Sequence, residues 1–299
     1  GSQGSSGHRF RDHLVVLQTS YRSGKRLLAL AAAVNRGEMV APAPIFMGAA
    51  LRMPADSFAI IGADANGGSG THSGRDGHAA LFEWADHHYS SPPEAGGEPY
   101  LQLTARLGGY SAEAMGQGGG KAMLFSLFEH LARARILTVA RHGPLGCVAL
   151  NRMIMGHLVR GHGLVCDPGT GLFSGTPVLL TRNDSALQLF NGDVGVALRD
   201  ETGALRLYVQ RGQSFISAPI MALPHWEPAF ATTVHKSQGS EYDEVLLVFP
   251  GDPHHRLLTR EILYTGITRA RERLMLMAGV EELQTALEQR IQRSSGLAW

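Results

Sequence analysis

The chain has 299 residues, 44% of them hydrophobic, which predicts a globular protein of one large or two modest domains. No apolar run approaches the roughly 20 residues of a membrane-spanning helix, and the start of the chain lacks the apolar segment of a signal peptide. Lys and Arg (27) nearly balance Asp and Glu (26), so locally placed basic groups would have to hold any polyanion. Cys147 and Cys166 cannot by themselves make a disulfide framework or a four-ligand zinc site. These features favour a cytoplasmic protein.

The first part of the chain predicts α/β alternation. After a disordered leader over 1–12, residues 13–18 form an apolar strand, and a Leu- and Ala-rich helix follows that Gly37 can end. A second strand over 58–61 and a helix over 78–89 are weaker predictions. Stretches rich in Gly, Ser and Pro are expected to be flexible loops: 62–77, 91–99 and 108–120.

Regular patterns return after residue 120. Helix, strand and helix are predicted over 121–134, 136–141 and 147–160. Short β-like runs separated by Asn-Gly and Gly turns then predict a small β-barrel over 175–224. A helix over 260–274, a strand over 274–279 and a terminal amphipathic helix over 281–293 complete the pattern. The sequence therefore predicts an α/β domain in two parts, 13–174 and 225–299, interrupted by the β-barrel.

A polar loop between two apolar runs stands out at 230–250, "FATTVHKSQGSEYDEVLLVFP". Together with "LYTGITRARERL", it resembles motifs V and VI of the superfamily 1 DNA helicases, most closely the RecD family, the alpha chain of exodeoxyribonuclease V. Three further stretches are similar to the same family: "LQTSYRSGKRLLALAAAVNRGE" to motif IV, "ILTVARHGPLGCVALN" to a strand and turn, and "GTPVLLTRNDSALQLFNGDVGVAL" to an SH3-like insertion. All five occur in the family's order, so the match is specific.

The resemblance implies a RecA-like helicase domain 2A with an inserted SH3-like barrel, 2B. It further implies the C-terminal motor domain of an ATP-dependent 5′–3′ DNA helicase, a subunit of exodeoxyribonuclease V acting in double-strand break repair and recombination. The implied partners are single-stranded DNA and the other subunits, RecB and RecC. The alternative from a different class is a non-catalytic module that binds single-stranded DNA or assembles subunits.

The chain departs from the family's full pattern at the phosphate loop. The nearest candidate, "MGQGGGKAM", has Met115 in place of the first glycine of the G-x-x-x-x-G-K-[ST] motif and Ala122 in place of its hydroxyl residue. It is interpreted as a glycine loop before a helix. The resemblance implies two RecA-like motor domains with ATP between them, of which the first supplies the phosphate loop and this chain is the second. ATP with Mg²⁺ is therefore expected to bind mainly to that first motor domain, and this chain alone is not expected to hydrolyse ATP. No metal ligands of its own are predicted.

Two arginines are implied to act on the nucleotide. Motif IV implies a γ-phosphate contact for Arg22 and a base-facing role for Tyr21. Arg269 maps onto the family's arginine finger. At ~100° per residue on a helix over 260–274, Arg269 would point away from the core and Arg271 would lie on a different face. Taken alone, Arg22 would be interpreted as a solvated surface group, and Arg269 as a partner in an i, i+4 surface ion pair, which contributes little to stability.

The motif V loop supplies the remaining candidate residues. Gly239 permits close backbone approach, and the resemblance implies that Glu241 accepts from the ribose hydroxyl. The phosphates of single-stranded DNA are assigned to Thr233, His235, Lys236 and Ser237. The β-rich insertion offers Arg182 and Asn183, with Asn191 and Arg211, as contacts for the displaced or incoming DNA strand. Asn-Gly followed by Asp is, however, foremost a turn sequence. Asn151 is expected to cap or orient a neighbouring loop and is given no catalytic role.

Overall fold

The computed structural model describes residues 24–39, 45, 47–61, 75–94, 96–223 and 225–291. The predicted leader over 1–12, the strand over 13–18 and most of the loop over 62–77 lie outside these ranges. Within them, no helix has the length and apolar character needed to cross a bilayer.

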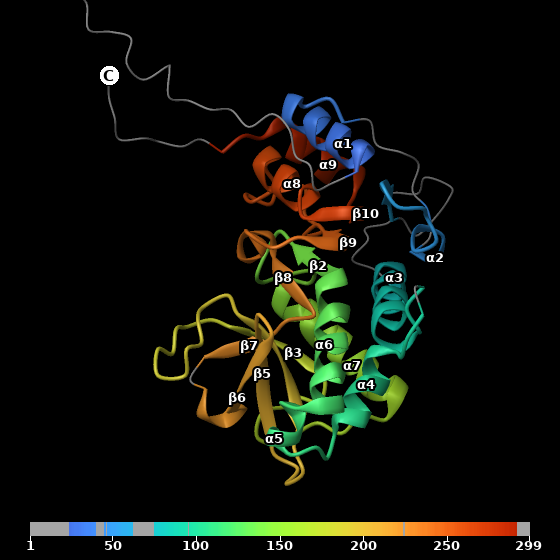
Figure 1. Ribbon diagram of the computed structural model, residues 1–299. Coiled ribbons are helices and arrows are strands. Elements are labelled where there is room, and N and C mark those ends of the chain that lie inside the picture. The colour runs from blue at the N-terminus through green and yellow to red at the C-terminus, as the bar shows by residue number, and fades with distance from the viewer. Residues whose placement is uncertain are drawn as a thin grey trace, which may run out of the picture.

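A five-stranded parallel sheet forms the centre of the α/β unit (Figure 1). Its strands, in spatial order, are β1 (Ser57–Ile60), β10 (Ala270–Met277), β9 (Tyr242–Val248), β2 (Ala134–Thr138) and β8 (Ala231–Thr233). All four neighbouring pairs are parallel. The carboxyl ends of the strands therefore meet at one edge of the sheet, where open α/β sheets place their ligands.

Helices cover both faces of this sheet (Figure 1). One face packs against α1 (Lys25–Arg36), α8 (Arg260–Ile267) and α9 (Val280–Glu288). The other packs against α2 (Met47–Ala50), α3 (Arg75–Ala85), α6 (Gly118–Arg133) and α7 (Cys147–His162), with α4 (Tyr100–Leu107) and α5 (Ala112–Met115) against α6. Alternate residues of β9 enter the two cores: Val245 and Leu247 the first, Leu246 and Val248 the second. This period of two is what a strand buried on both faces requires.

A second sheet is antiparallel and is inserted between α7 and β8. Its strands run in the order β6 (Ser214–Pro219), β5 (Leu205–Arg211), β4 (Val194–Arg199), β3 (Thr176–Leu180) and β7 (Trp226–Pro228). It has its own apolar core, which includes Val178, Leu207 and Ala218. Its strands run from Thr176 to Pro228, so β7 lies beyond residue 224, where the predicted β-barrel ends. Among the described residues the sheet is open, with β6 and β7 at its edges.

The first predicted helix ends where the sequence indicates. Gly37 adopts φ 81° and closes α1, its N–H donating to the carbonyl groups of Ala33 and Val34. The stretch 108–120 differs from the prediction of a loop, because it contains α5 and the first turn of α6. Gly120 explains part of this difference: a Cβ there would lie 2.4 Å from the carbonyl oxygen of Ala114, so glycine lets α5 and α6 approach closely.

The predicted helix over 260–274 is wrong in its second half. α8 ends at Ile267, and β10 begins at Ala270, which pairs with Tyr242. Leu274 to Met277 are fully buried between the two helical layers, a position that only a central strand of this sheet can occupy. The spacing of Leu263, Ile267, Ala270 and Leu274 fits a helix, but pairing with β9 outweighs that local preference.

Candidate functional site

The polar loop of motif V joins β8 to β9. It leaves the sheet at Thr233, passes through a 3-10 turn over Val234–Ser237, and returns to the opposite edge, where β9 begins. Gly239 adopts φ 88°, a conformation that favours glycine. The turn packs against α8, so the loop crosses the face of the sheet beside the helix that leads to Arg269.

Arg269 lies in the connection between α8 and β10, not on a helix. The helical-wheel argument for its direction is therefore wrong, because no helical turn continues past Thr268. Its Nε donates to the carbonyl oxygen of Thr265 (3.2 Å), and its Nη1 donates to the carbonyl oxygen of Ser240 (3.0 Å). The structure nevertheless brings Arg269 to the end of the motif V loop, beside Glu241.

Arg271 has different surroundings from Arg269. Its Nε donates to Oε2 of Glu241 at 3.2 Å, and its Nη1 lies 3.8 Å from Oδ1 of Asp243. The guanidinium of Arg269 contacts only neutral oxygen atoms among the described residues: the two carbonyl groups and the Thr268 hydroxyl. Among the described residues, Arg271 is thus paired with carboxylates, whereas Arg269 is held by neutral oxygen atoms.

The proposed DNA-contacting residues of the loop fall into two groups. His235 and Lys236 are exposed and Thr233 is half-buried, but Ser237 is 2% exposed and its hydroxyl donates to the carbonyl oxygen of Val234 at 2.8 Å. Lys236 donates to a carboxylate oxygen of Glu227 on β7. The second oxygen of that carboxylate lies 2.9 Å from Nη2 of Arg141. Sequence reasoning missed both residues, since Arg141 stands in a stretch for which only a strand and turn were predicted, and Glu227 belongs to no motif.

Asn151 fixes the strand that leads into the loop. Its Oδ1 accepts from the Ala231 N–H (2.9 Å), and its Nδ2 donates to the Ala231 carbonyl oxygen (2.9 Å). The Cys147 thiol also donates to that carbonyl at 3.2 Å, and burial raises the pKa of Cys147 to about 11. Asn151 thus ties α7 to β8 and orients the strand before the loop, as expected.

The candidates in the insertion mainly hold its own loops. Nη1 of Arg182 lies 3.1 Å from Nε2 of His225, and Oδ1 of Asn183 accepts from the Asn191 N–H at 2.7 Å. Arg211 pairs with Asp193 and lies over the Phe190 ring, 5.8 Å from its centroid. The turn chemistry predicted for this segment is present, because Asn183 and Asp193 accept from backbone N–H groups of Asn191 and Phe190.

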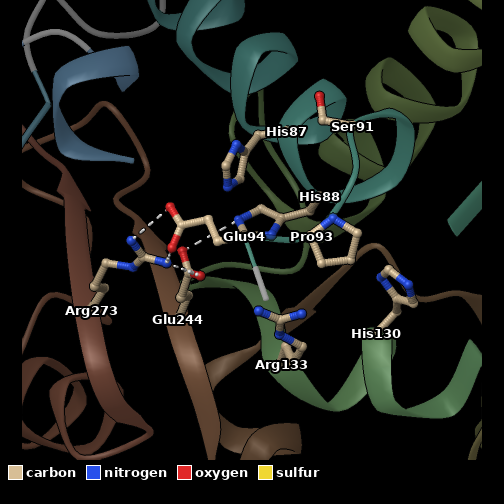
Figure 2. Close-up of a pocket in the computed structure, with 9 residues that line it drawn as sticks. All are labelled: His87, His88, Ser91, Pro93, Glu94, His130, Arg133, Glu244 and Arg273. Carbon is tan, nitrogen blue, oxygen red and sulfur yellow. Dashed lines mark hydrogen bonds and ion pairs between the residues drawn. The ribbon is translucent and has the colours of Figure 1, made fainter. Parts of the chain in front are cut away.

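A partly buried polar pocket lies on the other face of the sheet (Figure 2). Arg273 of β10 lies at one side of it, 2.7 Å from Glu244 and 3.2 Å from Glu94. His88, in the π-helical turn Asp86–Ser90 after α3, lies 3.6 Å from Oε2 of Glu244. Desolvation lowers the pKa of His88 well below its ordinary value and raises the pKa of Glu244 against the opposing effect of Arg273.

Ligand atoms of His87, His88 and Glu244 lie within 4.8 Å of one another, a grouping that could hold a metal ion. Arg273 already binds Glu244, and Arg133 also lines the pocket. Two guanidinium groups oppose the approach of a cation. We therefore interpret the pocket as a polar contact between layers.

Gly24, at the start of α1, donates its N–H to the Arg271 carbonyl at 3.2 Å, while Tyr21 and Arg22 precede the described residues.

Known proteins are similar in sequence to this part of the chain. The UvrD-like helicase C-terminal domain matches residues 228–277, which include the motif V loop, α8 and β10. RecBCD enzyme subunit RecD of Mycobacterium tuberculosis is 37% identical over 185 residues, 62% of this chain and 31% of that protein. The same subunit of Mycolicibacterium smegmatis is 31% identical over 94% of this chain and 42% of its own length. The ATP-dependent RecD2 DNA helicase of Deinococcus radiodurans is 34% identical over 54% of this chain. The chain spans less than half the length of each of these relatives.

Proposed function

We propose that this chain, a C-terminal helicase segment of the RecD type, is the second RecA-like motor domain of an ATP-dependent 5′–3′ DNA helicase. In this role it contributes to exodeoxyribonuclease V, in double-strand break repair and recombination, with RecB and RecC as partner subunits in the cytoplasm. The proposal extends to the antiparallel sheet, which serves as the SH3-like element beside the DNA path.

One observation carries the proposal: Arg269 is held by neutral oxygen atoms at the end of the motif V loop. Among the described residues no carboxylate pairs with it, whereas Arg271 pairs with Glu241 and Asp243. A guanidinium that is positioned but not neutralised is suited to the charge that develops on a phosphoryl group in transfer. Its planar fork also matches phosphate oxygens.

The residues of the chain then have separate roles. ATP with Mg²⁺, held mainly by the first motor domain, would supply the phosphoryl group that is transferred. Arg269 stabilises the transferring group, Arg22 contacts the γ-phosphate, and Glu241 accepts from the ribose hydroxyl, its carboxylate oriented by Arg271. His235 and Lys236, on the same loop, hold phosphates of single-stranded DNA. A shift of this loop would therefore change its contacts with the nucleotide and with DNA.

The decisive test uses the full-length protein. Arg269→Ala should reduce DNA-stimulated ATP turnover by about 10³-fold or more, with a much smaller change in nucleotide affinity, as when an arginine finger is withdrawn. Arg271→Ala is the matched control and should retain most of the turnover. Equal losses in both variants, or full activity in Arg269→Lys, would make Arg269 a structural residue only.

The chain alone should behave differently. Because Met115 is fully buried and Ala122 lacks a hydroxyl, the glycine-rich stretch has no phosphate-loop chemistry. The purified 299-residue chain should bind ATP weakly and hydrolyse none, measured by phosphate release with and without DNA. DNA-stimulated turnover by this chain would contradict the proposed division of labour.

The alternative is a binding module without a motor role. The exposed basic side chains at the loop, Lys236 and Arg141, favour it as a description of the chain by itself. The two functions separate when the first motor domain is supplied: a motor piece restores ATPase activity that depends on Arg269, whereas a binding module restores none.

A further inference from the structure

Glu227 connects two basic side chains that come from different parts of the fold. It lies on β7, the last strand of the antiparallel sheet, and its side chain is only 15% exposed. One carboxylate oxygen accepts from Lys236 in the motif V turn, and the other lies 2.9 Å from Nη2 of Arg141, which follows β2. Lys236 and Arg141 are considerably more exposed, at 31% and 48% of their side chains.

The arrangement resembles a phosphate held between two cations. A carboxylate and a phosphate present the same kind of acceptor oxygens to Lys and Arg. β2 and β8 are neighbouring parallel strands, and Arg141 and Lys236 follow their carboxyl ends, at the sheet edge that favours ligands. The carboxylate thus occupies the position where an anion from outside would be bound best.

A purely structural role explains less of this geometry. Ion pairs between partly exposed groups contribute little to stability, because solvent screens them. The same weakness makes Glu227 easy to displace, which a competitor must be. Because Glu227 pairs with both of them, Lys236 and Arg141 do not form an open basic patch that would bind any polyanion.

We propose that Lys236 and Arg141 form one binding site for a phosphate of the single-stranded DNA backbone, and that Glu227 is its built-in competitor. The inference rests on the proposed DNA-binding role of the motif V loop and adds Arg141 and Glu227 to it. The strand enters by displacing the carboxylate, so Glu227 weakens binding and favours release. A helicase motor must release each phosphate as it moves along DNA, so this competition sets how readily the phosphate dissociates.

The test measures binding of a fluorescently labelled oligothymidylate to the 299-residue chain by anisotropy at several salt concentrations. E227Q should tighten binding roughly three- to ten-fold, since it removes the competing charge and keeps the side chain's size. Lys236→Ala and Arg141→Ala should each weaken binding and lower the salt slope by about 0.7. Glu98→Gln, which removes a carboxylate paired with Arg106 (2.6 Å), is the control for net charge and should leave affinity unchanged.

The decisive comparison places E227Q in a chain that also carries Lys236→Ala and Arg141→Ala. There it should have no effect, because no site remains to compete for. Tightening in that background as large as in the native chain would reduce the effect to bulk charge and overturn the proposal. Glu227→Asp, which keeps the charge on a shorter side chain, should give intermediate affinity, and it is the second variant if E227Q lowers the Tm.

The possible failures are distinguishable. If Lys236→Ala and Arg141→Ala weaken binding and E227Q changes nothing, the competitor is refuted and the DNA role of the loop stands. If neither basic substitution changes affinity, the phosphate site is refuted, and so is DNA binding by this loop.

Discussion

Asn151 shows how one side chain can determine the position of a functional loop. Its amide group matches both polar backbone atoms of Ala231, at 2.9 Å each. Asn151 is 4% exposed, so water cannot replace these bonds. Because Ala231 precedes the motif V loop by only a few residues, the amide fixes where the loop starts.

Asn151→Ala should lower the free energy of unfolding by about 1–3 kcal/mol, since it leaves the buried Ala231 N–H without this acceptor and removes one of the two side-chain donors to the Ala231 carbonyl. Urea denaturation followed by circular dichroism measures this loss. Asn183→Ala, which removes an exposed hydrogen bond to Asn191, is the matched control and should stay within about 0.5 kcal/mol of the native chain. Equal effects in the two variants would contradict the structural role of Asn151.

For Arg269, the structure gives a different physical reason from the one inferred from the sequence. The motif predicted the residue, and a helical wheel predicted its direction. No wheel applies, because the residue follows the end of α8. What distinguishes Arg269 from Arg271 is the charge of their partners, carbonyl oxygens in one case and carboxylates in the other. Partners from distant parts of the chain are not visible in a local pattern.

Secondary structure was predictable where a segment's own pattern decides it. The amphipathic helix α7 follows from its sequence, as does α1 with its closing Gly37. The boundary between α8 and β10 does not, because the pairing of Ala270 with Tyr242 and the burial of Leu274 depend on β9. The contact between Glu227 and Arg141 also requires both sheets to be in place, so no motif announces it.

Two glycines should respond in opposite ways to the same substitution. A Cβ at Gly195 in β4 would lie 2.3 Å from the carbonyl oxygen of Tyr208 on β5, whereas one at Gly161 in α7 would meet nothing within 4 Å. Gly195→Ala should destabilise the protein by about 1–3 kcal/mol through strain between paired strands. Gly161→Ala should stabilise it by about 0.5–1 kcal/mol, because alanine loses less backbone entropy in a helix. Thermal unfolding measures both, and a shift of the same sign would contradict the local geometry.

The pocket in Figure 2 joins separate layers of the molecule. Arg273 of β10 donates to the carbonyl groups of Leu51 and Met53, next to α2, as well as to Glu94 and Glu244. The segments around Met53 and Glu94 are therefore tied to the sheet by one buried guanidinium, in addition to the pairing of β1 with β10. Loss of this contact would destabilise the α/β unit.

The protonation of His88 should make stability depend on pH. His88 faces His87, His130, Arg133, Arg273 and Glu244, and its pKa is lowered well below 6.5 by desolvation and by the neighbouring positive groups. The unfolded chain then binds more protons than the folded one below pH 6.5, so this stability is complete above that pH and is lost as the pH falls toward the folded pKa. The pKa values of His87 and His130 are lowered as well, chiefly by desolvation, and act in the same direction. Glu244 acts in the opposite direction, since its folded pKa is raised above 4.5 and it makes stability fall as the pH rises through that window.

Urea denaturation at pH 7.5 and pH 5.5 tests this balance. The free energy of unfolding should be lower at pH 5.5, and the difference should shrink in His88→Gln, which cannot take up the proton. A second comparison separates the histidine from the carboxylate. Glu244→Gln removes the opposing titration, so the fall in stability between the two pH values should become larger, even though the variant also loses the contact with Arg273. Stability that is unchanged or higher at pH 5.5 in the native chain would mean that His88 is charged in the folded protein and paired with Glu244.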